Sequence, residues 1–384
     1  MTASDTNGAC ICVGANSGTS LDGIDAFVFE LHAREGLVPG RLPRVLAHEY
    51  LPYEAEFRAD LEQLCAGATI GLHELGRLSI LVARAYVAAI TAAIHKSGHT
   101  FAQVAVVGVH GQTVHHQPVG SERFTIQIGE PNTIAVALGI PVVSDFHRRD
   151  MALGGQGAPL VPGFHDLALR VPDRARVVLN CGGIANVTLL LPGRETFGFD
   201  VGPANVLIDA WIRHCGGEGF DADGAWARSG VVVAPLLDEM LREPFFAAPF
   251  PKSTGRELFN LPWVLGAIER SACSQATQAD VQRTLLALSI ITIAEVVRQQ
   301  GPAARGQLLV CGGGTRNGFF MQGLAEALPA WEVSPTDAHG IPAQAMEAMA
   351  FAAFAVRTMN GLPSNEPAVT GASRRCMLGN VFMP

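Results

Sequence analysis

Short apolar runs separated by Gly, Pro and polar residues divide the chain into strand-like and helix-like segments. Runs rich in β-branched residues predict strands, and apolar residues at spacings of three and four predict helices with one buried face. The predicted strands are 9–13, 24–31, 44–53, 104–109, 124–128, 140–144, 176–180, 185–191, 196–199 and 308–311. The predicted helices are 55–65, 73–96, 131–138, 204–214, 231–242, 260–271, 279–300, 318–328 and 343–359.

The order of these segments occurs twice along the chain. Three strands and then a helix begin near residue 9, and the same order begins again near residue 176. Each time a Gly-rich turn joins the first two strands. This repeat predicts an α/β protein with two related domains, which we place at 1–143 together with about 362–384, and at 144–361. The tail after Pro363 shows little regular pattern, so it has to be tied to a domain if it is ordered.

The composition supplies material for two cores and argues against some functions. Hydrophobic residues make up 48% of the 384 residues, and the net charge of −8 comes without a cluster of Lys and Arg, which argues against a nucleic-acid partner. No apolar run approaches the roughly 20 residues of a membrane span, and no secretory signal is evident. We therefore expect a cytoplasmic protein with no membrane partner. The eight cysteines form no CxxC pair, so we expect reduced thiols.

Four Gly-containing turns lie at strand ends, at 14–25, 180–188, 198–205 and 310–317. The first has glycines that leave room for an anion, hydroxyl donors, and carboxylates of the type that Mg²⁺ prefers. The candidate ligands in this loop are Gly18, Thr19, Ser20, Asp22, Gly23 and Asp25. An ordinary β-hairpin turn is the alternative. The loop is not a Walker loop, because the terminal Gly-Lys-Ser/Thr is missing.

The turn at 198–205 leads into a predicted helix. The N–H groups of Gly202, Ala204 and Asn205 can meet a phosphate at the helix N-terminus, where the helix dipole favours an anion. Asp200 would repel a phosphate there unless it takes a proton or holds a metal, so it is the first candidate for a general base. The alternative is an Asx-turn residue that caps the helix.

The turn at 310–317 contains Gly312, Gly313 and Gly314, which would let an adenine lie flat against the backbone. A close strand-to-helix turn is the alternative. The segment FDADG holds Asp221 and Asp223, for which helix capping is favoured over a calcium loop because the other calcium ligands are absent.

Two further segments carry polar side chains that suit ligand binding. In HGQTVHH, His110, Gln112 and Thr113 suit a polar ligand, and the spacing of the histidines fits no zinc pattern. The segment 145–162 begins with the charged residues Asp145, Arg148, Arg149 and Asp150. An Arg there can bind a ligand carboxylate with two hydrogen bonds, and a solvated loop with local ion pairs is the alternative.

Eight motifs in one order resemble the signatures of the anhydro-N-acetylmuramic acid kinase family, from about residue 12 to 380. They are GTSLDGID, HGQTVHH, GGQGAPLVP, GGIANVT, GFDVGPAN, FDADGAWA, KSTGRELFN and NEPAVTGASRR. The resemblance implies two ribonuclease H-like domains of the sugar kinase, heat-shock chaperone and actin superfamily, with a nucleotide and sugar cleft between them. It implies ATP and Mg²⁺, hydrolytic opening of the 1,6-anhydro ring, and phosphorylation of O6 to give N-acetylmuramic acid 6-phosphate in peptidoglycan recycling. It also suggests a homodimer.

Carried over by motif, Gly18 to Asp25 resembles the first phosphate loop and Asp200 to Asn205 the second, while Gly312 to Gly314 resembles the nucleoside loop. Asp200 resembles the catalytic base. Of the two carboxylates in the first loop, Asp22 and Asp25, one is expected to face Mg²⁺ and the other to be structural; Asp22 is the candidate Mg²⁺ ligand, with Asp25 as the alternative. The expected sugar contacts are His110, Gln112, Asp145, Arg148 and Glu347.

The chain departs from the family pattern at two positions. Asn16 replaces a Met, and His147 replaces an Arg, which removes a permanent charge and a bidentate fork. A kinase of a related amino sugar is one alternative function, if His147 has altered the carboxylate site. A catalytically inactive nucleotide-binding regulator of the same fold is an alternative of a different class.

Overall fold

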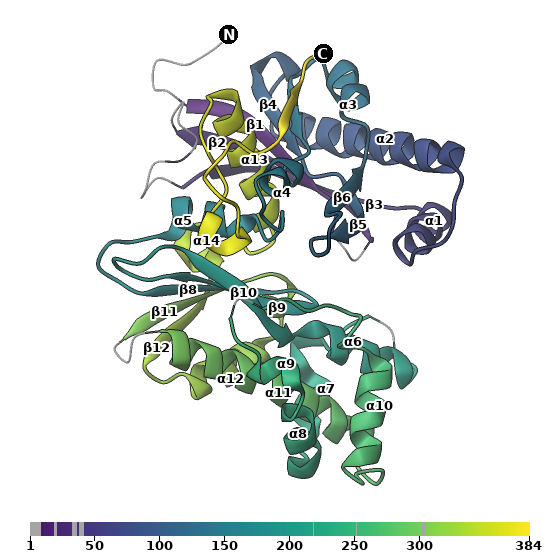
Figure 1. Ribbon diagram of the computed structural model, residues 1–384, viewed down its shortest axis with the longest axis vertical. Helices are drawn as coiled ribbons and strands as arrows, with labels where there is room; N and C mark the ends of the chain where they lie inside the picture. Colours follow the sequence, from purple (N-terminus) through teal and green to yellow (C-terminus); the bar gives the residue numbers. More distant parts are fainter. Residues whose placement is uncertain are drawn as a thin grey trace. The chain divides into compact units, whose positions relative to one another are not determined.

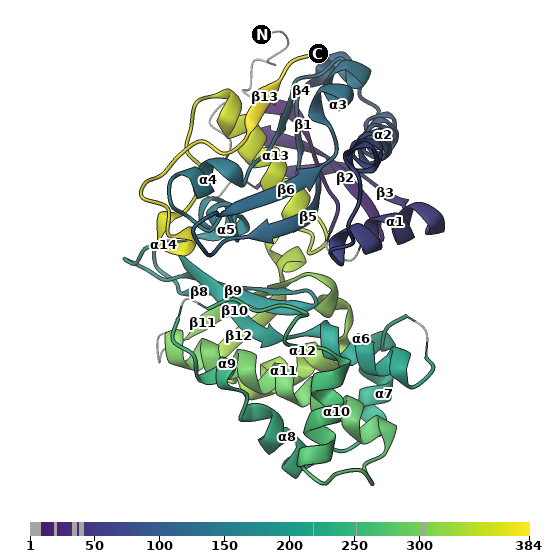
Figure 2. The same cartoon turned by 45° about the vertical axis from the view of Figure 1, so that its right-hand side comes forward.

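The computed structural model describes residues 9–18, 21–32, 37, 42–217, 219–250, 252–301 and 305–384. The chain divides into two compact α/β units, which Figures 1 and 2 show in two views. Unit 1 comprises Met1–Ala168 and Ala345–Pro384, and unit 2 comprises Leu169–Gln344.

Unit 1 is built on a six-stranded sheet. In sheet order, its strands are β13 (Asn380–Phe382), β7 (Val142–Ser144), β4 (Val104–Val109), β1 (Ala9–Asn16), β2 (Gly23–His32) and β3 (Arg44–Pro52). The first three strands of the chain pair antiparallel, whereas β4 is parallel to both β1 and β7. A separate antiparallel ribbon consists of β5 (Gln112–Gln117) and β6 (Phe124–Ile128).

Two long helices cover opposite faces of the unit 1 sheet. On one face, α2 (Leu72–Lys96) packs with the core that contains Val13 and Ala15. On the other face, α13 (Met346–Met359) lies against β1 and β4, because Gly14 and Gly108 have no side chains that would hold the helix away. The other helices of this unit are α1 (Ala55–Cys65), α3 (Pro131–Leu138), α4 (Arg148–Ala152), α5 (Val161–Leu169) and α14 (Pro367–Thr370).

Unit 2 contains a five-stranded sheet. In sheet order, its strands are β10 (Phe197–Pro203), β9 (Ile184–Leu190), β8 (Arg176–Cys181), β11 (Gly306–Cys311) and β12 (Trp331–Pro335). Its helices are α6 (Asn205–His214), α7 (Ala225–Ser229), α8 (Ala234–Leu241), α9 (Pro244–Ala247), α10 (Leu261–Arg270), α11 (Gln278–Gln300) and α12 (Gly318–Ala327). The most buried of these, α11, joins α6, α8 and α12 in one core with the sheet.

The two units share a topology. In each, three antiparallel strands come first along the chain, and two further strands extend the sheet in parallel beside the first strand. Unit 1 reads β3-β2-β1-β4-β7 and unit 2 reads β10-β9-β8-β11-β12. The predicted duplicated α/β organisation with two ribonuclease H-like domains is confirmed at the level of strand order.

The predicted domain boundaries differ from the observed units. The prediction assigned residues 144–168 and 345–361 to the second domain, whereas both belong to unit 1. Residues 345–361 belong to unit 1 because the Ala-rich helix α13 packs against β1 and β4. A boundary placed at 361 separates this helix from the sheet on which it packs.

The strands β5, β12 and β13 were not among the predicted strands, and β10 continues to Pro203 instead of ending at Phe199. The tail is tied down as expected, because Ser364 N donates to Cys376 O and β13 pairs with β7. All eight cysteines are free thiols, as predicted.

Helix α2 is long and apolar enough to cross a membrane by length and composition alone, which corrects the prediction that no segment approaches that length. A core helix passes the same test. In unit 1, Leu78, Val82, Tyr86 and Ile90 of this helix are buried in the core. The apolar face of α2 is thus accounted for by packing within the unit.

Candidate active site

The loop between β1 and β2 holds the first group of predicted ligands. Thr19 and Ser20 lie outside the described residues. Around them, Leu21 N donates to Gly18 O at 3.2 Å, and Leu21 has a φ of 54°, so the chain turns tightly at this point. The turn leaves the side chain of Asp22 exposed.

The two carboxylates of this loop have different surroundings. Asp25 Oδ1 lies 2.8 Å from His48 Nε2, whereas Asp22 is exposed at the turn. Mg²⁺ in kinases is held by one or two carboxylates together with water and substrate phosphates, so Asp22 fits that chemistry better than Asp25. A Cβ on Gly23 would lie 2.3 Å from Leu51 O, so the pairing of β2 with β3 by itself requires this glycine.

Gln112 lies in the interior rather than at a surface. Its side chain is fully buried, and Ser17 Oγ donates to its Oε1 at 2.6 Å. Tyr53 OH in turn donates to Ser17 Oγ at 3.0 Å, and burial raises the pKa of Tyr53 to about 12. This buried chain fixes the start of the first loop, so in the structure Gln112 has a positioning role. The sequence pattern did not indicate Ser17 or Tyr53, because Gln112 is distant from both in the chain.

His147 is buried and His110 is partly buried, and the two rings form a pair. Their Nε2 atoms lie 2.8 Å apart, and His147 Nδ1 donates to Gly157 O at 2.6 Å. His110 Nδ1 also lies 3.0 Å from Gly111 O, so a neutral His110 can donate either to that carbonyl or to His147 Nε2, but not to both. Burial lowers the pKa of His110 to about 3 and that of His147 to about 4, so both rings are neutral at pH 7. His110 also packs on the ring of Phe351.

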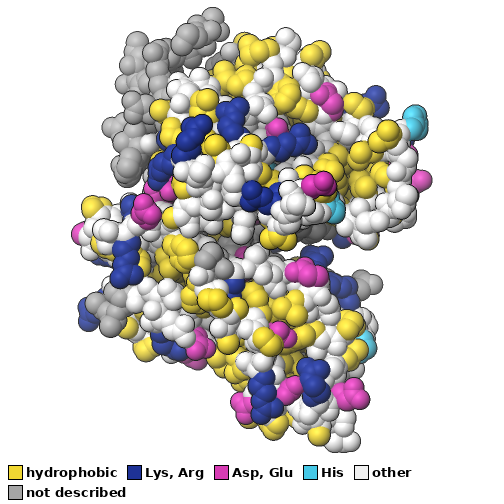
Figure 3. All heavy atoms as spheres, in the orientation of Figure 1, with side chains coloured by type: hydrophobic (Ala, Val, Ile, Leu, Met, Phe, Trp, Pro, Cys, Tyr) yellow, Lys and Arg dark blue, Asp and Glu magenta, His cyan; other side chains and the backbone are white. Residues whose placement is uncertain are grey.

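The charges that follow β7 are only partly solvated. Asp145 has a φ of 64°, accepts a hydrogen bond from Asn380 Nδ2 at 2.9 Å, and lies 3.4 Å from Arg148 Nε. Arg149 Nη2 donates to Asn380 Oδ1 at 3.0 Å. Figure 3 shows basic side chains, coloured dark blue, on the drawn face of unit 1. Arg148 is exposed. Local ion pairing, which the sequence left open, is present, and the guanidinium of Arg148 remains accessible to a ligand.

Asp150 is the buried anchor of this segment. Its carboxylate accepts hydrogen bonds from Gly157 N at 2.9 Å, Asn365 Nδ2 at 2.8 Å and Thr370 Oγ1 at 2.8 Å. These bonds tie α4 to the C-terminal tail, so Asp150 has a structural role that the sequence pattern did not distinguish from its charged neighbours.

Glu347 begins the long helix on the other side of the sheet. It lies in the first turn of α13, and Asn16 Nδ2 donates to its Oε2 at 3.0 Å. Asn16 ends β1 and is one of the two departures from the family pattern. Its amide therefore orients a carboxylate that the sequence resemblance assigns to sugar binding.

In unit 2, Asp200 lies within a strand instead of in a loop. A bulge between Asp200 and Gly202 lets β10 continue, and a Cβ on Gly202 would lie 2.8 Å from the ring of Phe246. The carboxylate does not cap α6. It accepts hydrogen bonds from Ser253 Oγ at 2.8 Å and Thr254 N at 3.0 Å. Burial raises the pKa of Asp200, and these two donors oppose the increase.

The N-terminus of α6 is already satisfied by protein groups. Ala204 N donates to Gly183 O at 2.9 Å, and Asn205 N donates to Gly182 O at 3.1 Å. The side chain of Asn205 also donates to Gly182 O, at 2.9 Å. The turn between β8 and β9 occupies the position expected for a phosphate, so a direct contact from these two N–H groups requires that turn to move.

The three glycines after β11 differ in their surroundings. A Cβ would lie 2.6 Å from Asn180 Oδ1 at Gly312 and 2.4 Å from Cys181 Sγ at Gly314, so close packing on β8 requires both. At Gly313 the nearest atom would be Asn205 Nδ2 at 3.8 Å. Gly313 is exposed and leaves the backbone open to a flat ligand.

The favoured reading of the FDADG segment is confirmed. Asp221 accepts hydrogen bonds from Trp226 N and Ala227 N at the start of α7, and Asp223 accepts one from Gly318 N at the start of α12. Among the described residues, no group of three or more His, Cys, Asp or Glu side chains is arranged to hold a metal ion.

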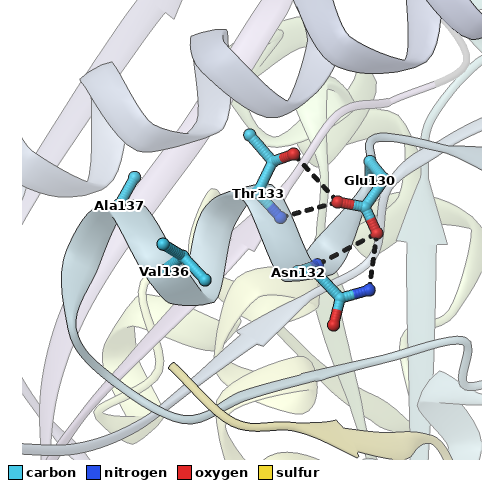
Figure 4. Close-up of a pocket in the computed structure, with 5 residues that line it drawn as sticks. All are labelled: Glu130, Asn132, Thr133, Val136 and Ala137. Atoms are coloured by element: carbon cyan, nitrogen blue, oxygen red, sulfur yellow. Dashed lines mark hydrogen bonds between the residues drawn. The ribbon is translucent and has the colours of Figure 1, made fainter.

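A surface cavity of about 440 Å³ lies over α3 and is separate from all of these residues. Figure 4 shows the carboxylate of Glu130, which accepts hydrogen bonds from the backbone and side chains of Asn132 and Thr133. Val136 and Ala137 complete the lining of the cavity. Its polar groups cap the helix, so this cavity offers no chemistry for a substrate.

Comparison with known proteins identifies the family. The family model described as anhydro-N-acetylmuramic acid kinase matches residues 10–384. The anhydro-N-acetylmuramic acid kinase of Vibrio cholerae serotype O1 is 44% identical over 97% of this chain and 98% of its own length. The enzyme of the same name from Aliivibrio fischeri is 42% identical over 96% of this chain and 98% of its own length.

Among solved structures, an activator of 2-hydroxyisocaproyl-CoA dehydratase from Clostridium difficile is 11% identical, with a TM-score of 0.45, over 90% of this chain and 94% of its own. The family assignment rests on the sequence matches alone. With 97% of its length aligned at 44% identity, the chain belongs to the anhydro-N-acetylmuramic acid kinase family.

Proposed function

We propose that this protein is an ATP-dependent kinase that opens the 1,6-anhydro ring of anhydro-N-acetylmuramic acid with water and phosphorylates O6. The product is N-acetylmuramic acid 6-phosphate, an intermediate of peptidoglycan recycling. The observation that carries the proposal is the sequence match over nearly the whole chain to kinases of that name. Asp200 lies in GFDVGPAN, a segment that resembles a motif of that family.

Asp200 is the general base in this reaction. It takes a proton from water, the water oxygen bonds to the anomeric carbon, and the bond from that carbon to O6 breaks. O6 then takes the γ-phosphoryl group of ATP, and ADP leaves. A carboxylate whose pKa is raised by burial is a stronger base than one in water. Positioning and charge stabilisation supply most of the rate.

ATP and Mg²⁺ are the proposed cofactors. The exposed carboxylate of Asp22 suits a Mg²⁺ ion bound to phosphate oxygens, and such an ion offsets the charge of the transferring phosphoryl group. Gly18 and its neighbours supply the first phosphate loop, and Asn205 belongs to the second. The open backbone at Gly313 suits an adenine.

The sugar contacts are proposed for unit 1. Arg148 offers an exposed guanidinium to a carboxylate, and Glu347, His110 and Asp145 offer groups for hydroxyl and amide hydrogen bonds. Gln112 acts on the ligand through Ser17 rather than directly, because it is fully buried.

The alternative, a kinase of a related amino sugar, is not favoured by the sequence relatives, and the departure at position 147 is the reason to test it. His147 is buried, and its lowered pKa keeps it neutral at pH 7, so it cannot replace the permanent charge of an Arg. A panel of N-acetylglucosamine, its anhydro form and anhydro-N-acetylmuramic acid separates the two candidates. The main proposal predicts the highest kcat/KM for the lactyl sugar, and the second predicts no preference for it.

The remaining expectations stay predictions: a cytoplasmic location, a homodimer, no nucleic-acid or membrane partner, and a cleft shared by the two domains. Cell fractionation tests the first, and light scattering on the purified protein tests the second. A monomer at micromolar concentration would contradict the dimer.

The direct test of Asp200 is an Asn substitution. Asp200→Asn is expected to abolish turnover and to leave ATP affinity within about twofold, because the amide keeps the shape but cannot take the proton. Asp238→Asn, the same change at an exposed position of α8, is the control and should retain full activity. Turnover of Asp200→Asn comparable to the control would contradict the role of Asp200 as base.

A further inference from the structure

Residues 252–254, here called the strap, run beside the outer edge of the unit 2 sheet at Asp200. β10 is the edge strand of that sheet, so the N–H of Asp200 faces away from β9 and donates to Lys252 O at 3.0 Å. Ser253 Oγ and Thr254 N both donate to the carboxylate of Asp200. The strap thus holds both the backbone and the side chain of this one residue.

The strap is itself anchored in unit 2. Lys252 Nζ donates to the carbonyls of Phe245 at 2.8 Å and Phe246 at 2.9 Å, and it lies 4.5 Å from the centre of the Phe245 ring. The centre of the Phe250 ring lies 5.1 Å from the ammonium and 4.1 Å from the ring centre of Phe199, the residue before Asp200. An ammonium fixed by carbonyls and aromatic rings gives the strap little freedom to move.

Both donors of the strap bind the same oxygen. Ser253 Oγ lies 2.8 Å and Thr254 N lies 3.0 Å from Asp200 Oδ2. Oδ1 accepts no hydrogen bond from any residue that the structure describes. Two donors on one oxygen stabilise negative charge there and fix the rotation of the carboxylate, while the other oxygen keeps its lone pairs for a proton.

We propose that the strap makes Asp200 a directional base, in which Oδ2 is held by Ser253 and Thr254 and Oδ1 takes the proton of the attacking water. Ser253 is a positioning residue in this arrangement. The inference rests on the proposed role of Asp200. In the step itself, the O–H bond of water breaks toward Oδ1, the water oxygen bonds to the anomeric carbon, and the electrons of the broken carbon–oxygen bond remain on O6.

The strap has two separable effects on Asp200. The Ser253 hydroxyl lowers the pKa of the carboxyl against the increase caused by burial, so its removal raises that pKa. It also fixes the direction of Oδ1, so its removal slows proton transfer even when the carboxylate is ionised. A residue that only supported the fold would change neither the pKa of Asp200 nor the pH dependence of kcat.

The test compares Ser253→Ala and Ser253→Thr with the wild type. Ser229→Ala, at an exposed serine of α7, is the control. Isotope-edited NMR follows the titration of the Asp200 carboxyl carbon, assigned with Asp200→Asn, and steady-state kinetics give kcat and KM against pH. The NMR titration needs no turnover, so it tests the strap even if the proposed substrate is wrong.

Ser253→Ala is expected to raise the measured pKa of Asp200, to move the acid limb of kcat to higher pH, and to lower kcat about 10–100-fold. The KM for ATP should stay within about twofold, and Ser253→Thr should restore the pKa and kcat. If Ser253→Ala fails to fold, Lys252→Met releases the anchor and should move the same two quantities in the same direction. An unchanged pKa of Asp200 in either folded variant overturns the proposal, as does a fall in kcat with an unchanged pH profile.

Discussion

The close contact between α13 and the unit 1 sheet predicts that two Gly→Ala substitutions change the stability of the protein in opposite directions. A Cβ on Gly14 would lie 1.8 Å from Ala348 O, and one on Gly108 would lie 2.2 Å from Phe351 O. Both obstacles are helix backbone, so no side-chain rotation can relieve them. By contrast, Gly76 lies inside α2, and a Cβ there would meet no atom within 4 Å.

The size of the effect follows from these distances. Ordinary contact begins near 3.4 Å, so Gly14→Ala requires a separation of 3.4 − 1.8 = 1.6 Å between β1 and the helix. Overpacking a core costs about 1–3 kcal/mol, and a contact between two backbones belongs at the upper end of that range. We expect Gly14→Ala to lower the free energy of unfolding by about 3 kcal/mol, which lowers the Tm of a unit of this size by about 6–12 °C.

Gly76→Ala is the matched control because it adds the same methyl group in open space. It should stabilise α2 by about 0.5–1 kcal/mol, since Ala favours a helix over Gly. Thermal unfolding followed by circular dichroism in one buffer measures both variants. A Gly14→Ala variant with a Tm within about 1 °C of the wild type, or a shift of both variants in the same direction, would refute this account of how α13 packs.

Two further predictions concern unit 1. Asp150→Ala leaves three buried hydrogen-bond donors without their acceptor, so it should lower the free energy of unfolding by about 3 kcal/mol and make limited proteolysis of the C-terminal tail faster. A cleavage rate equal to that of the wild type would contradict the role of Asp150 in holding the tail. The lowered pKa values of His110 and His147, about 3 and about 4, lie below the unfolded value of about 6.5. The stability that these rings contribute is therefore complete above pH 6.5 and declines as the pH falls toward 4, by about 2 kcal/mol for each ring at pH 5. Chemical denaturation should show this decline, and His147→Gln should make it shallower; an identical slope would contradict the neutral pair.

The local sequence pattern was sufficient to predict the bounds of an element whose own residues carry a clear apolar pattern. The strand 104–109 and the helix 131–138 have the predicted bounds, because a continuous β-branched run and a Pro start with an apolar stripe mark them. The strand β12 was missed because only Trp331 in WEVSP is buried, so the segment has no apolar alternation. The strand β13 depends on pairing with β7, which no local pattern reports.

The candidate site shows the same limit. An electrostatic mismatch at a helix start singled out Asp200, and that reasoning needs only neighbouring residues. The contacts that hold it come from Ser253 and Thr254, more than fifty positions along the chain. The contact between Ser17 and Gln112 likewise joins distant segments. Partners of this kind follow from the folded topology, and the only sequence signal for the strap was the polar triplet in KSTGRELFN.

The central claim is that one active site joins hydrolytic ring opening to phosphorylation. The most direct measurement incubates the protein with Mg-ATP and anhydro-N-acetylmuramic acid in water enriched in heavy oxygen, followed by tandem mass spectrometry. The account predicts a product heavier than the substrate by one water and one phosphoryl group, with the heavy oxygen in the sugar and none in the phosphate ester. A product that gained only a phosphoryl group, or one with heavy oxygen in its phosphate, would contradict it.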